Sequence, residues 1–108
     1  MNTQPPVPGR TTITARALNR LAVGIVRDAS RADATDVSLQ LSDDSGALRA
    51  RVTMPIVIEA DDRLTVEQRA EHVRDEFVDR MNALAGRTVR RVDIRYSGVR
   101  QTQQSRVT

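Results

Sequence analysis

The sequence contains no cysteine, no lysine and no tryptophan, and its single histidine is His72. The absence of cysteine excludes disulfides and thiol chemistry, and one isolated histidine excludes the usual zinc-ligand spacings. A glycine-rich phosphate-binding loop is also missing, because Gly24 stands alone inside a helical pattern. We therefore expect a protein that is not an enzyme and that binds no metal ion or other cofactor.

Few of the remaining polar residues suggest a reactive site. His72 lies off the apolar stripe of its helix, which favours a solvated side chain over proton transfer. Asp43 and Asp44 are expected to form a turn. The acidic loop at residues 59–62 is interpreted as a solvated segment, with weak cation binding as the alternative.

Long apolar runs are absent as well, since no window approaches the roughly 20 apolar residues that cross a bilayer. We expect a cytoplasmic chain without direct transmembrane insertion. A length of 108 residues fits one domain. Apolar periodicity is confined to residues 10–99, so residues 1–9 and 100–108 are predicted to be flexible tails, the second of them basic.

The net charge of the chain is smaller than its isoelectric point of about 10.8 suggests. All 17 basic residues are arginine, and the formal net charge is only +3. Without lysine, little besides Tyr96 and the α-amino group titrates between neutral pH and the arginine range, so a small excess of arginine keeps the isoelectric point high. Arg100 and Arg106 carry much of this excess, which leaves the domain itself nearly balanced.

The first half of the sequence predicts a helix and a hairpin. Thr14 is a plausible N-cap for a helix at residues 15–29, preceded by a short extended segment at Thr11 to Ile13. A period of two then predicts strands at residues 36–41 and 48–58, joined by a turn at residues 43–46. Pro55 would interrupt a central strand, but a partner that ends at Leu41 leaves it outside the hairpin pairing.

The second half predicts a helix and a final strand. Thr65 and Gln68 have the spacing of a capping box, and Gly86 offers a left-handed stop. The last strand is expected at residues 88–96. The helix between them has an apolar stripe at Val66, Ala70, Val73, Phe77, Met81 and Leu84.

These elements predict an α+β fold in the order β-α-β-β-α-β, with a small, mostly antiparallel sheet and two helices packed on one face. A ferredoxin-like strand order is the default for this pattern. The first strand, Thr11 to Ile13, is short and polar, so a sheet of three strands is the alternative.

The order of these elements carries a resemblance to a known family. The opening Gly9-Arg-Thr-Thr-Ile-Thr and the segment from Met81 to Val99, with its Gly86 stop and Ser-Gly-Val ending, resemble the bacterial alkaline-shock, envelope stress response proteins over residues 9–99. The resemblance implies a non-enzymatic, self-associating protein at the cytoplasmic side of the cell membrane, tethered through a small membrane anchor protein. The chain departs from the family pattern at residues 29–33 and in the arginines of its closing strand.

Three charged surfaces are the candidate interaction sites. The outer face of the first helix is basic and that of the second is acidic, which suggests pairing between copies or two simply solvated faces. The polar sheet face would suit an anionic ligand, and a small nucleic-acid-binding module is the alternative function. Without an aromatic stacking platform, specific nucleic-acid binding is not expected. The residues are Arg16, Arg20, Arg27 and Arg31 on the first helix, Glu71, Asp75 and Asp79 on the second, and Arg49, Arg51, Arg91 and Arg95 on the sheet.

Overall fold

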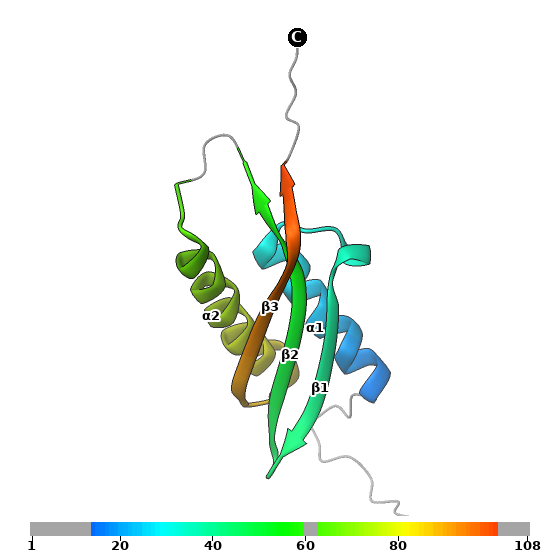
Figure 1. Cartoon of the computed structure of the whole chain (residues 1–108). Coiled ribbons are helices and arrows are strands. Elements are labelled where there is room, and N and C mark those ends of the chain that lie inside the picture. The colour runs from blue at the N-terminus through cyan, green and yellow to red at the C-terminus, as the bar shows by residue number, and fades with distance from the viewer. Residues whose placement is uncertain (1–13, 60–62, 102–108) are drawn as a thin grey trace, which may run out of the picture.

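The computed structural model describes residues 14–59 and 63–101 as two helices packed on one face of a three-stranded sheet (Figure 1). The elements follow one another in the order α-β-β-α-β, with a short 3-10 helix before the first strand. The strand expected at Thr11 to Ile13 lies outside the described residues. In order, the elements are α1 (Ala15–Ser30), η1 (Ala34–Asp36), β1 (Ser38–Asp44), β2 (Ala47–Ile58), α2 (Val66–Ala85) and β3 (Val89–Gln101).

The helix α1 begins and ends where local signals place it. Thr14 caps the N-terminus by accepting a hydrogen bond from the Ala17 amide at 3.1 Å. Arg31 ends the helix in the left-handed conformation, with φ of 65°. Val23, which helical spacing places on the same side as the exposed arginines, is half-buried and packs against the core.

The strands β1 and β2 form the predicted antiparallel hairpin, but the turn is tighter than expected. Asp44 pairs with Ala47, so Asp43 and Asp44 belong to the strand rather than to the turn. Ser45 and Gly46 alone make the connection, with φ of 55° and 91°. Two positive φ values match the twist of a two-residue hairpin.

The helix α2 also matches its predicted ends. Thr65 and Gln68 form the complete capping box, with reciprocal bonds of 3.0 and 2.9 Å. Gly86 ends the helix with φ of 65°. The apolar stripe is shorter than predicted, because Val66 and Leu84 are 46% and 54% exposed at the two ends of the helix.

The sheet is mixed, which corrects the expectation of a mostly antiparallel sheet. Its order is β1-β2-β3, with β2 in the centre, antiparallel to β1 and parallel to β3. The reason is the connection through α2. This helix carries the chain back from the end of β2 to the level at which β2 began, so β3 runs in the same direction as β2. Since β3 pairs directly with β2, no place remains between them for another strand, and the ferredoxin-like order is wrong.

The strand β3 extends beyond its predicted end at Tyr96. Arg100 and Gln101, which were assigned to the basic tail, pair with Val57 and Ile58 of β2. Residues 102–108 lie outside the described residues. A shift in register near Pro55 places two residues of β3 opposite this one residue of β2. After the shift Val57 is buried, whereas Ile56 and Ile58, which continue the alternation from Leu48, are only half-buried.

The core lies between the sheet and the two helices. Phe77, Ile25 and Met54 are its largest fully buried side chains, and they come from α2, α1 and β2. Among the described residues, no polar or charged residue is buried. The charged side chains are therefore all available to the two outer surfaces of this two-layer fold.

Candidate interaction surfaces

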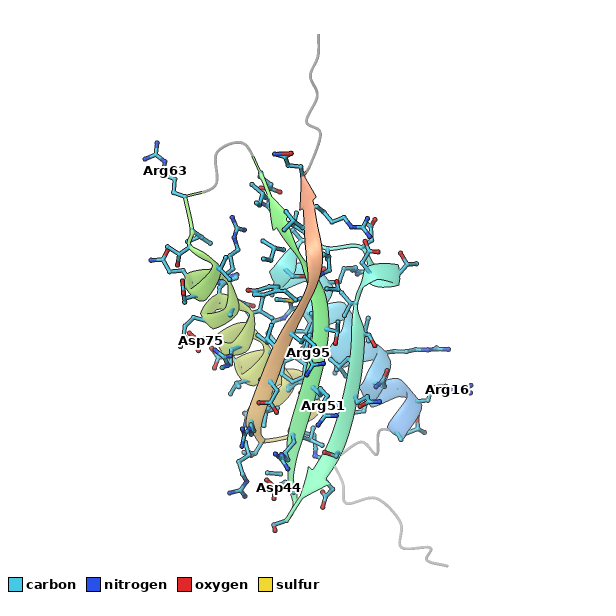
Figure 2. All side chains as sticks on the ribbon, in the orientation of Figure 1. Arg16, Asp44, Arg51, Arg63, Asp75 and Arg95 are labelled. Carbon is cyan, nitrogen blue, oxygen red and sulfur yellow. The ribbon has the colours of Figure 1, made fainter. Side chains whose placement is uncertain are left out.

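The outer surface of the helix layer carries two rows of charge. The helices α1 and α2 run in opposite directions behind the sheet (Figure 1), and an ion pair of 3.6 Å between Arg80 and Asp28 joins them. At 100° per residue, Arg16 and Arg20 lie opposite the buried stripe of α1. Glu71, Asp75 and Asp79 lie opposite the buried stripe of α2 in the same way, and the side chains of both rows are exposed. Figure 2 shows Arg16 and Asp75 on their two helices.

Only part of each row has an internal partner. Arg27 lies 3.7 Å from its neighbour Asp28. Arg31 caps α1 and forms an ion pair with Glu59, which directly follows β2. This contact removes Arg31 from the set of unpaired charges. Glu71 pairs with Arg74 at 3.7 Å, one turn along α2. Among the residues of the two rows, Arg16, Arg20, Asp75 and Asp79 form no ion pair with another residue of the described part of the chain.

The open face of the sheet is the second surface. Arg49 lies directly opposite Arg91, and Arg51 lies opposite Asp93, on adjacent strands. Arg91 bonds Asp93 at 3.1 Å, which compensates one positive charge. Arg95 is exposed beside Thr53. Figure 2 shows Arg51 and Arg95 on this face, away from the helices.

The uncompensated charge on this face is positive. Arg49, Arg51 and Arg95 form no ion pair with another residue of the described part of the chain. Residues two apart on a strand lie about 7 Å apart, and adjacent strands about 5 Å, so the three guanidinium groups share one small area. A shallow hollow of about 530 Å³ reaches this face, and its lining includes Gln40 and Ser42 of β1. The predicted sheet residues are therefore brought together.

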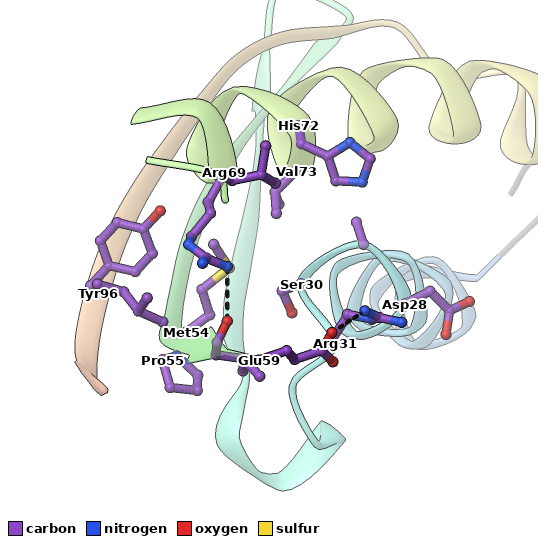
Figure 3. Close-up of a pocket in the computed structure, with 14 residues that line it drawn as sticks. Asp28, Ser30, Arg31, Met54, Pro55, Glu59, Arg69, His72, Val73 and Tyr96 are labelled. Carbon is purple, nitrogen blue, oxygen red and sulfur yellow. Dashed lines mark hydrogen bonds and ion pairs between the residues drawn. The ribbon is translucent and has the colours of Figure 1, made fainter. Parts of the chain in front are cut away.

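A hollow of about 520 Å³ lies between the C-terminal end of α1, the first half of α2 and the second half of β2 (Figure 3). Met54, Val57 and Val73 supply apolar lining. Arg69 closes one side by donating a hydrogen bond of 2.8 Å to the carbonyl oxygen of Val57. His72 is exposed at the rim, as its position off the stripe predicted. No sequence pattern indicated this hollow, because residues from elements distant in the chain line it.

Tyr96 is the only aromatic side chain that lines the hollow. Its hydroxyl donates a hydrogen bond of 3.2 Å to the carbonyl oxygen of Val66. Partial burial raises the pKa of Tyr96 above 10.0, although the nearby positive charges of Arg69 and Arg74 oppose the rise. The phenol is therefore held in its neutral, hydrogen-bonding form.

Across residues 14–59 and 63–101, no group of three or more histidine and carboxylate side chains is placed to hold a metal ion. Glu59 from the predicted acidic loop is engaged with Arg31, and Asp61 and Asp62 lie outside the described residues. No helix in this part of the chain is long and apolar enough to cross a bilayer.

Comparisons with protein-family models, with curated proteins and with solved structures found no match.

Proposed function

We propose that this protein is a non-enzymatic, self-associating interaction module of the envelope stress response type. It acts at the cytoplasmic side of the bacterial membrane, with a membrane-anchored protein as a further partner. The resemblance over residues 9–99 supports the family and the location. The unpaired charges of the helix layer support self-association, and they are the observation on which the proposal depends.

This observation matters because the rows have opposite signs and point away from the core. Arg16 and Arg20 belong to the basic row, and Asp75 and Asp79 to the acidic row, and none of them forms an ion pair within the described chain. Complementary charges on two protein surfaces guide encounter and fix orientation. A second copy presents the same two rows and is thus a suitable partner.

The test is analytical ultracentrifugation of the whole chain over a wide range of protein and salt concentrations. Because exposed ion pairs each contribute only about 0.2 to 1 kcal/mol, we expect weak, reversible association that decreases with added salt. The variant His72→Ala serves as a control and should associate like the native protein. A monomer at every concentration at low salt would contradict the proposal.

A second candidate function is the binding of nucleic acid through the open sheet face. The observation that favours it is the group Arg49, Arg51 and Arg95 on this face, whose positive charges no acidic side chain of the described residues compensates. Stacking on bases is not supported, since Phe77 is fully buried and Tyr96 is turned toward the hollow. We therefore expect weak binding without sequence preference.

This candidate is tested by titrating fluorescent duplexes of unrelated sequence with the native protein and with the double variant Arg49→Glu and Arg95→Glu. Native binding should weaken steeply with salt, and the variant should lose it. Sequence-selective binding at physiological salt would favour a dedicated nucleic-acid-binding protein over the scaffold.

A further inference from the structure

We infer that two copies of this chain pair through their helix layers about a two-fold axis that runs parallel to the helices. This inference deepens the proposed self-association and rests on it. In this arrangement α1 of each copy lies on α2 of the other, so the basic row of one chain meets the acidic row of its partner twice.

The first support is that both rows are unfavourable in an isolated chain. Arg16 and Arg20 are four residues apart on α1, and like charges at this spacing repel by a few tenths of a kcal/mol. Asp75 and Asp79 repeat the arrangement on α2. Arg16 also lies in the first turn of α1, where the helix dipole disfavours a positive charge and no acidic residue is present. An opposing row of opposite sign would relieve these repulsions.

The second support is the placement of the two rows on neighbouring helices of one layer, with Arg16 and Asp75 at its opposite flanks (Figure 2). The helices lie side by side in a single layer, with α1 over the β1 side of the sheet and α2 over the β3 side (Figure 1). A surface that carries both signs is self-complementary when it is rotated onto itself, which is the property of a two-fold contact. A head-to-tail contact, which the sequence pattern alone would equally allow, uses only one row of each copy.

The direction of the axis follows from the charges. A rotation of 180° about an axis parallel to the helices keeps each residue at the same position along that axis and exchanges the two sides of the helix layer. The helix α1 of one copy therefore faces α2 of the partner. The N-terminal half of α1, with Arg16 and Arg20, then lies level with the C-terminal half of α2, which carries Asp79, because the two helices are antiparallel. Rotation about an axis across the helices would instead place α1 on α1 and α2 on α2, with like charges in contact.

Pairing through the sheet edges is disfavoured by the same reasoning. The edge strand β3 carries Arg90, Arg91, Arg95 and Arg100 against the single acid Asp93. Two β3 strands from different copies would place these arginines against one another. The edge strand β1 carries Asp43 and Asp44 and no basic residue, so two β1 strands would repel as well.

The test is a pair of charge-reversal variants, Arg16→Glu with Arg20→Glu, and Asp75→Arg with Asp79→Arg. Each variant alone places like charges at both contacts, so the dissociation constant of the dimer should rise about tenfold or more. An equimolar mixture restores opposite charges at both contacts and should return the dissociation constant to near the native value. Sedimentation velocity at low salt measures the masses, and circular dichroism verifies that each variant is folded.

A matched control is the double variant Arg49→Glu and Arg95→Glu, which changes the net charge by the same amount on the opposite face. It should dimerise like the native protein. Native association that survives either helix variant overturns the helix-layer pairing but leaves the proposed self-association intact. A mixture that grows beyond two chains overturns the two-fold symmetry. A native protein that is monomeric throughout contradicts both proposals.

Discussion

Tyr96 offers an unusually direct measurement of how this fold responds to alkaline pH. The chain has one tyrosine, no tryptophan and no lysine, so tyrosinate absorbance reports on Tyr96 alone and no lysine titrates in the same range. Burial raises the pKa of this phenol above 10.0 in the folded protein. We expect the absorbance midpoint to lie above 10.0 in buffer and to return to about 10 in concentrated denaturant.

The same shift predicts the pH dependence of stability. Because the folded state keeps the phenol proton to a higher pH than the unfolded state, the corresponding stabilisation is present below the unfolded pKa. It is lost as the pH rises through the folded pKa. The free energy of unfolding should therefore fall above about pH 10, with a slope of at most about 1.4 kcal/mol per pH unit from this residue.

Urea denaturation at a series of alkaline pH values measures this slope. The variant Tyr96→Phe lacks the titrating group and should show no such decrease over the same range. It also loses the hydrogen bond to Val66. At this half-exposed position the loss should lower the free energy of unfolding by at most about 1.5 kcal/mol. An absorbance midpoint that is identical in buffer and in denaturant would refute the reasoning.

Two further predictions concern the core and a helix end. Replacing the fully buried Phe77 by alanine should lower the free energy of unfolding by about 3 to 5 kcal/mol in urea melts, through lost burial and a residual cavity. Gly86→Ala forces a side chain into the left-handed conformation with φ of 65°, so we expect a loss of about 1 to 2 kcal/mol in thermal melts; an unchanged melting temperature would contradict it.

The parts of the fold that the sequence predicts well are those set by local chemistry. Thr65 and Gln68 specify the start of α2 because the capping box involves only residues three apart, and Gly86 specifies its end by conformational freedom. Thr14 acts in the same way for α1. These positions were correct because no distant contact is needed to satisfy them.

The incorrect expectations depend on contacts between distant segments. The parallel pairing of β3 with β2 follows from the crossover through α2. The residues of the two strands do not by themselves indicate that they will pair with each other. Val66 and Leu84 match the helical period, but the neighbouring elements do not cover the ends of α2, so both remain exposed. The register shift beside Pro55 turns Val57 inward, which a period of two cannot anticipate.

The charged surfaces can be predicted from the sequence only in part. Helical spacing alone places Arg16 and Arg20 opposite the core, and Asp75 and Asp79 likewise. Their placement on neighbouring helices depends on tertiary contacts, because α1 packs over β1, α2 packs over β3, and the two helices contact each other. That neighbourhood makes a two-fold contact self-complementary. In the proposed dimer the arginine-bearing sheet face of each copy lies on the outside, so the proposed self-association and the proposed anion binding would use opposite faces and would not compete.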